Sequence, residues 1–162
     1  MKKIHPMLWF DDQAAEAAKH YVSIFPNSEL GTISRYSGAG PGAEGSVMTV
    51  EFTLDGQRFV ALNGGPDFKF NEAISFVVPC ESQEEVDRYW DKLVAGGEES
   101  YCGWLKDRYG LSWQIVPIEL DQMMLDPDPQ KAQRVTEAML KVRGKFDIAE
   151  LRAAYEGVPT PV

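Results

Sequence analysis

The feature that most constrains this chain is that one order of predicted elements, a strand, a helix and three strands, occurs twice. In the first half, an apolar run at 4–10 predicts a buried strand, and apolar residues at helical spacing predict a helix from Ala14 to Phe25. Asp11 and Asp12 precede this helix and are its candidate N-caps. The three strands predicted after the helix lie at 30–36, 47–54 and 58–62.

The second half begins the same order again. Residues 73–78 predict an apolar strand, and Ser82 with Glu85 forms a capping box at the start of a helix. That helix carries an apolar stripe and ends at Gly96-Gly97; the stripe consists of Val86, Tyr89, Trp90, Leu93 and Val94. Further strands are predicted at 101–105 and 111–118. The charges of Lys106-Asp107-Arg108 predict a solvated hairpin turn between these two strands.

A repeat of this type cannot bury its sheet faces alone, so the two units must pair. We therefore predict an α+β fold of two paired βαβββ modules, with helices outside curved, mainly antiparallel sheets. After Pro117 the pattern becomes helical, and a rigid Asp-Pro-Asp-Pro stretch precedes the longest tail helix. The whole chain is predicted to be one domain, composed of module 1 at 1–66, module 2 at 71–118 and C-terminal helices at 119–157.

Charge and cysteine usage exclude several classes of partner. The chain has 25 acidic and 16 basic residues, a net charge of −9, which opposes binding to nucleic acid or anionic lipid. No apolar run is long enough to span a membrane, and Asp11 and Asp12 follow the basic N-terminus too early for a signal peptide. Cys80 and Cys102 lack metal or redox spacing, so we expect reduced thiols in a cytoplasmic protein.

Three stretches carry a resemblance to a known family. They are Ala61-Leu62-Asn63-Gly64-Gly65-Pro66, the segment from Cys102 to Pro117 that ends in Trp113-Gln114-Ile115-Val116-Pro117, and Leu125 to Ala132. The chain resembles the PhnB-like branch of the glyoxalase/bleomycin-resistance/extradiol-dioxygenase superfamily, also called vicinal oxygen chelate proteins. Members of that branch often carry the label 3-demethylubiquinone-9 3-methyltransferase. The resemblance implies paired βαβββ modules that form a cupped sheet, usually in a homodimer.

Strand alternation predicts which side chains line that cup. His5, Met7 and Trp9 share one face of the first strand, and Gln114 shares a face of the last strand with Ser112 and Val116. The predicted lining is largely apolar with a few polar groups, as small-molecule pockets are. It comprises His5, Met7, Trp9, Phe59, Asn63, Ser75 and Gln114. The alternative for His5 and Gln114 is a purely structural role as hydrogen-bonded side chains. A Gly- and Pro-rich loop at 37–46 could act as a lid over the cup.

The resemblance also implies where a metal would lie. Metal enzymes of the superfamily take one ligand from the first and one from the last strand of each module, which gives His5, Ala61, Ala73 and Gln114 here. Only His5 and Gln114 can coordinate, whereas a catalytic divalent site normally needs about three protein ligands. Asn63, Glu72 or Ser75 could substitute only in a different strand register. We therefore expect no tightly held metal; if one binds, His5 and Gln114 would hold it.

Two functions of different class remain. The first is binding of a small, partly apolar molecule without a cofactor. The alternative is a divalent-metal-dependent lyase, isomerase or dioxygenase-type enzyme that acts on a small oxygenated substrate. The sequence shows no Gly-rich loop after the first strand of a parallel sheet, so it does not support methyl transfer. The catalytic residues, if any, stay open, and the predicted partners are a small-molecule ligand and a second copy of the chain.

Overall fold

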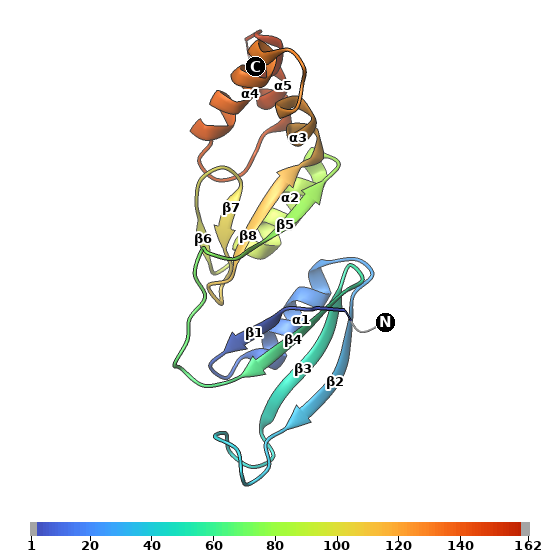
Figure 1. The fold of residues 1–162 in the computed structure, drawn as a ribbon, viewed down its shortest axis with the longest axis vertical. Coiled ribbons are helices and arrows are strands. Elements are labelled where there is room, and N and C mark those ends of the chain that lie inside the picture. The colour runs from blue at the N-terminus through green and yellow to red at the C-terminus, as the bar shows by residue number, and fades with distance from the viewer. Residues whose placement is uncertain (1–2, 160–162) are drawn as a thin grey trace. The chain divides into compact units, whose positions relative to one another are not determined.

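A computed structural model describes residues 3–159, which form two compact units with the boundary between Phe70 and Asn71 (Figure 1). Each unit contains one four-stranded sheet and runs through a strand, a helix and three strands. The predicted α+β class with a repeated βαβββ order and a helical C-terminal tail is confirmed. No helix within residues 3–159 has the length and apolar character needed to cross a membrane.

The first unit contains a mixed sheet in the order β1-β4-β3-β2. β1 runs parallel to β4, and the other neighbours are antiparallel. Its elements are β1 (Met7–Phe10), α1 (Ala14–Ile24), β2 (Glu29–Arg35), β3 (Val47–Leu54) and β4 (Gln57–Asn63). The first strand is shorter than predicted, because pairing with β4 begins at Met7.

One face of this sheet is covered by α1. The helix contacts β3 and β4 through a stripe of small residues and one large ring, Tyr21, which stacks on Phe52 with 6.3 Å between ring centroids. Phe52 in turn stacks on Phe59, its partner on β4. Alanines at 14, 17 and 18 are fully buried, and their small side chains allow the helix to lie close to the sheet.

The N-terminus of α1 differs from the prediction. Neither Asp11 nor Asp12 is the N-cap; Gln13 occupies that position, and its side chain makes no capping hydrogen bond. Instead, Asn63 Oδ1 at the end of β4 accepts a hydrogen bond from the Ala14 backbone N–H at 2.8 Å. A side chain 49 residues away therefore satisfies one of the free N–H groups of this helix.

The second unit repeats the strand order as β5-β8-β7-β6, again with one parallel pair, β5 and β8. Its elements are β5 (Ser75–Cys80), α2 (Gln83–Val94), β6 (Glu98–Glu99), β7 (Trp104–Lys106) and β8 (Ser112–Pro117). The predicted cap of α2 is present, since Ser82 Oγ accepts a hydrogen bond from the Glu85 N–H at 3.2 Å. The strand predicted at 101–105 starts only at Trp104, because Cys102 and Gly103 have positive φ and form a turn.

The turn between β7 and β8 is not the solvated loop that its charges predict. Asp107 is only 2% exposed. Its carboxylate accepts hydrogen bonds from the backbone N–H groups of Tyr109 and Leu111 and, at 2.9 Å, from the indole Nε1 of Trp113. A buried carboxylate with three donors fixes this hairpin and the position of Trp113 under α2.

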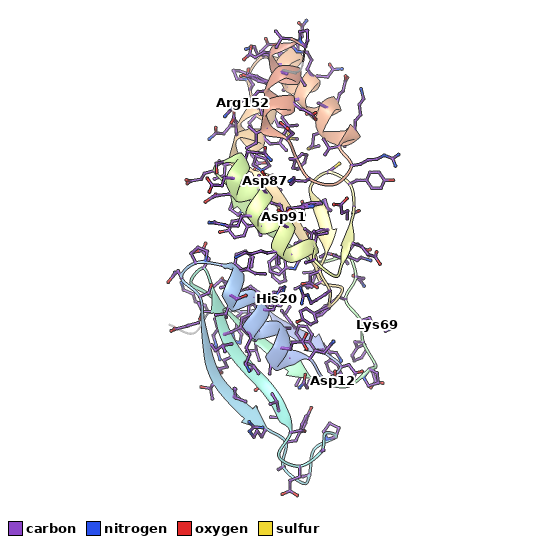
Figure 2. The ribbon with its side chains drawn as sticks, turned by 180° about the vertical axis from the view of Figure 1, so that it is seen from behind. Asp12, His20, Lys69, Asp87, Asp91 and Arg152 are labelled. Atoms are coloured by element: carbon purple, nitrogen blue, oxygen red, sulfur yellow. The ribbon has the colours of Figure 1, made fainter. Side chains whose placement is uncertain are left out.

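Three helices complete the second unit: α3 (Ile118–Met124), α4 (Pro129–Lys141) and α5 (Ile148–Glu156). Their own core consists of Leu120, Met123, Val135, Phe146 and Leu151. The segment between α4 and α5 joins this core to the sheet region, because Cys102 and Gly103 donate backbone hydrogen bonds to Val142 and Gly144 at 3.0 Å. An ion pair of 2.7 Å also links Lys145 to Asp87 on the outer face of α2 (Figure 2).

Candidate functional site

The open face of the second sheet, opposite α2, carries two rows of side chains across its strands. Pairing places Lys106, Ser112 and Ser75 in one row on β7, β8 and β5. The next row contains Trp104, Gln114 and Val77. The alternate residues of β8, Trp113 and Ile115, lie on the other face and are buried. The sheet therefore presents Gln114 outward with Ser75, and Trp113 toward the helix.

Gln114 and Ser75 are joined directly. Gln114 Nε2 donates a hydrogen bond of 2.9 Å to Ser75 Oγ, and both side chains are half-buried. The Ser75 hydroxyl hydrogen stays available for donation. No hydrogen bond to Gln114 Oε1 occurs within residues 3–159, which leaves that oxygen as an acceptor. The pair thus offers two donors, the Ser75 hydroxyl and the second Nε2 hydrogen of Gln114, and one acceptor, Gln114 Oε1, between the indole ring of Trp104 and the exposed side chain of Val77.

An ion pair borders the first row. Lys106 Nζ lies 2.5 Å from Glu72 Oε1, in the segment before β5. The hydrogen bond between them lowers the pKa of the Glu72 carboxyl and raises the pKa of the Lys106 ammonium, so both stay charged near neutral pH. Beside this pair, the Ser112 hydroxyl is buried and has no hydrogen-bond partner among the described residues. The sequence pattern does not mark Trp104 or Lys106 as site residues. Ser112 could have been found, because it shares a strand face with Gln114.

The open face of the first sheet includes Met7 and Trp9. Met7 is exposed, whereas Trp9 donates from Nε1 to Gly65 O at 2.9 Å and meets the edge of Phe68 at 5.0 Å. His5 precedes β1, and its Nδ1 lies 3.2 Å from the Lys3 carbonyl oxygen. Of the predicted site residues in this unit, Trp9 is therefore fixed by a hydrogen bond to the segment after β4, and His5 lies outside the sheet.

Phe59 and Asn63 do not share the open face, contrary to the predicted alternation. Phe59 packs on Phe52 under α1, and Asn63 holds the N-terminus of that helix. The reason is the phase of β4: Phe59, Val60 and Ala61 are all buried, and the charged residue that marks the outer face, Arg58, stands near the start of the strand. Ala61 also faces the helix, and the outward positions beside it are Val60 and Leu62.

A separate cavity of about 580 Å³ lies at one end of the first unit. It is bounded by the loop at 41–46, the turn between β1 and α1 and the segment at 63–67. Tyr36, which is buried, forms part of its wall and donates a hydrogen bond of 2.5 Å from its hydroxyl to the Asn63 carbonyl. The Gly-rich loop extends beyond the ends of β2 and β3 (Figure 1), and Asp12 forms part of the cavity wall.

The donor set does not fit a divalent metal. Within residues 3–159, no group of three or more His, Cys, Asp or Glu side chains is placed to hold an ion. The outward positions on β4, Val60 and Leu62, offer no lone pair, and Ala73 lies before β5 begins. On β4, the position implied for a ligand, Ala61, faces the helix, and its outward neighbours Val60 and Leu62 cannot coordinate a metal either.

Comparison with known proteins places this fold in a family. The family model described as 3-demethylubiquinone-9 3-methyltransferase matches residues 2–116, more than half of the chain. The chain belongs to that family. A solved relative with the same description is a PhnB protein, so the PhnB-like resemblance seen in the sequence is confirmed. The family match ends before α3, so the C-terminal helices lie outside it.

The PhnB-like assignment is supported by a solved structure, and more distant structures are similar in fold or in part of it. The PhnB protein from Bacillus cereus is 39% identical, with a TM-score of 0.66 over 72% of this chain and 99% of that chain. A protein from Pseudomonas aeruginosa shares the fold at 18% identity, with a TM-score of 0.60 over 72% of this chain and 98% of that chain. The fosfomycin resistance protein FosX from Listeria monocytogenes, solved with Mn(II) and sulfate, is 17% identical over 73% of this chain and 92% of that chain, with a TM-score of 0.49. No curated protein sequence matches the chain.

Proposed function

We propose that this PhnB-like protein binds a small, partly apolar molecule on the open face of the second sheet, with Gln114 and Ser75 as its polar anchor. The observation that carries this proposal is the 2.9 Å hydrogen bond from Gln114 Nε2 to Ser75 Oγ between Trp104 and Val77. It leaves two donors and one acceptor for a ligand, which suits a hydroxyl, amide or carboxyl group on a molecule with an apolar body.

The donor set supports binding without a tightly held metal. His5 lies before β1 and Gln114 is engaged with Ser75, and an enzyme of the alternative class would need about three ligands plus an open position. The turn between β1 and α1, Asp11-Asp12-Gln13, contains no glycine. It therefore lacks the loop that methyl-donor domains of doubly wound type use, and we do not extend the activity in the family's name to this chain.

The test compares two glutamine variants of the full chain. Gln114→Leu removes the polar anchor with little change in size, and Gln57→Leu is the matched control at an exposed glutamine of the first unit. The probe is 2-phenylethanol, titrated against ¹⁵N-labelled protein. Loss of a hydrogen bond predicts an affinity about threefold to tenfold weaker for Gln114→Leu and no change for Gln57→Leu. Equal affinities for both variants and the unaltered chain would overturn the proposal, as would an absence of binding.

We also propose that the protein is a homodimer. The second unit exposes several large apolar side chains, and two-fold pairing is the commonest way to cover such surface. They are Ile74, Leu125 and Leu140. Light scattering at micromolar concentration should give twice the 18.1 kDa mass of one chain, and a mass near 18.1 kDa would contradict the proposal. The cytoplasmic location stays a prediction; both cysteines are free thiols.

A further inference from the structure

A small hollow adjoins the Gln114–Ser75 pair at the β6–β7 edge of the second sheet. It has a volume of about 110 Å³, and we call it the acidic pocket. The side chains that matter in its lining are Glu72, Glu98, Glu99, Trp104, Lys106 and Ser112. Trp104 belongs both to this pocket and to the row of Gln114, so a ligand over Gln114 reaches the pocket past the indole ring.

The charges of the pocket are unbalanced. Two carboxylates, Glu72 and Glu98, lie on the same face as the one ammonium, Lys106, which is already paired with Glu72 at 2.5 Å; Glu99 pairs with Leu105 and points to the α2 face. Glu99 Oε1 accepts a 3.3 Å hydrogen bond from the Trp90 indole. The Glu98 carboxylate accepts no hydrogen bond from the residues at 3–159 and is exposed on a two-residue strand. The pocket therefore retains one carboxylate, Glu98, that forms no ion pair with a side chain of residues 3–159.

The Ser112 hydroxyl is a second and independent observation. The residue is 0% exposed, and its Oγ lacks a hydrogen-bond partner within the described part of the chain. A buried hydroxyl without a partner is rare in native proteins and is destabilising. An N–H donor that enters the pocket between Lys106 and Trp104 would give this oxygen the bond it lacks.

The size of the pocket limits what can enter. Because a water molecule occupies roughly 30 Å³, about 110 Å³ accommodates a head group of a few heavy atoms and excludes an aromatic ring. Trp104 adds an indole ring, whose face attracts cations. A metal ion does not fit, because no three ligating side chains of residues 3–159 converge here.

We propose that the acidic pocket binds the primary ammonium head of the ligand whose apolar body lies over Trp104 and Gln114. The ammonium group donates to Ser112 Oγ and to the Glu98 carboxylate, and the indole of Trp104 covers its remaining side. This inference rests on the proposed function and narrows its ligand class to small amphiphilic amines. An anionic head is disfavoured, because it would meet the Glu72 and Glu98 carboxylates, and the one ammonium, Lys106, is already paired.

The test is a matched pair of probes at low ionic strength, where charge effects are least screened. 2-Phenylethylamine is charged at pH 7 and 2-phenylethanol is neutral, while both carry the same ring and chain. Titration of the ¹⁵N-labelled full chain should show the amine binding at least about fivefold more tightly than the alcohol. Glu98→Gln and Ser112→Ala should each lower this amine-to-alcohol ratio about threefold or more, whereas Glu84→Gln, an exposed carboxylate on α2, should leave it unchanged.

Each result decides between the two proposals. Equal binding of amine and alcohol, with resonances of Gln114 perturbed by both, would overturn the amine inference and leave the proposed function standing. Tighter binding of 3-phenylpropionate than of the amine would also overturn it, because Lys106 would then be the anchor. If Glu84→Gln and Glu98→Gln lowered the amine-to-alcohol affinity ratio equally, the preference for the amine would come from the overall charge of the protein. That result would overturn the assignment of the ammonium group to the pocket. Binding of none of the probes would overturn both proposals.

Discussion

The two units share one strand order but stabilise their outer strands in different ways. In the first unit, β2 and β3 have 7 and 8 residues and form a long antiparallel pair. Their counterparts β6 and β7 have only 2 and 3 residues. There the segment at 142–144 bonds to residues 100–103, and α3, α4 and α5 supply a second core. The second unit, with its short outer strands, thus gains stability from the added helices, whereas the first unit gains it from its longer strands.

The helix starts show the same contrast. α1 has no local side-chain cap and relies on Asn63 from β4, whereas α2 is capped by its neighbour Ser82. The first unit therefore uses a long-range polar contact where the second uses a local one. Corresponding strands of the two units therefore have different roles although the topology is the same. Asn63 at the end of β4 caps α1, whereas Gln114 on β8 lies on the open face of its sheet.

The largest expected effect comes from the added core. Phe146 is 1% exposed and packs against Gly103, where a Cβ would lie 2.5 Å from Phe146 Cε2. Phe146→Ala should destabilise the second unit by about 3–5 kcal/mol, whereas Phe68→Ala, which removes an exposed ring in edge contact with Trp9, should destabilise the first unit by about 1 kcal/mol or less. Urea unfolding followed through resonances of each unit measures both. A cost below about 1 kcal/mol for Phe146→Ala would show that the sheet of the second unit does not need the tail.

A smaller difference is expected between the two helix starts. Asn63→Ala breaks the bonds to Ala14 N–H and, through Nδ2, to the Val47 carbonyl, so it should cost about 2 kcal/mol in the first unit. Ser82→Ala removes one exposed cap and should cost about 1 kcal/mol in the second. The same unfolding measurement compares them. If Ser82→Ala proved the more costly change, the long-range cap would not be what holds α1.

Much of this architecture could be predicted from the sequence because its signals are local. The Ser82–Glu85 box, the apolar stripe of α2 and the turn at Asp55-Gly56 each specify structure within a few residues. The phase of β4 was not accessible, since its consecutive buried residues show no alternation. The same holds for Asn63 as a cap and for Asp107 as a buried acceptor, because both depend on partners that only the folded chain brings near.

In the candidate site, alternation around Gln114 predicted its outward orientation and that of Ser112. Ser75 followed from the expected strand at 73–78, although pairing actually begins at Ser75 itself. The ion pair of Lys106 and Glu72 could not be predicted, because the two residues are 34 positions apart and β5, α2 and β6 lie between them in the chain. A sequence can indicate which residues share a strand face, whereas contacts between strands require the register.

The smallest expected effect is a pH dependence confined to the second unit, which contains both cysteines. Burial raises the pKa of the Cys80 thiol from near 9.0 to about 11. The folded state favours the neutral thiol. The stabilisation that this preference gives to the folded protein is therefore complete below about pH 9.0 and is lost as the pH rises toward 11. At pH 9.5 the loss should stay below about 1 kcal/mol. Cys80→Ala should remove this part of the pH slope; an unchanged slope would assign it to other groups.

The most direct test of the account is a map of where a ligand binds. ¹⁵N-labelled full-length chain titrated with 2-phenylethanol should show its largest shifts at the Gln114 side-chain amide, the Trp104 indole N–H and the Ser75 backbone N–H, all in the second unit. Shifts centred instead on Trp9 or on Tyr36 in the first unit would contradict the central claim that the open face of the second sheet is the binding site.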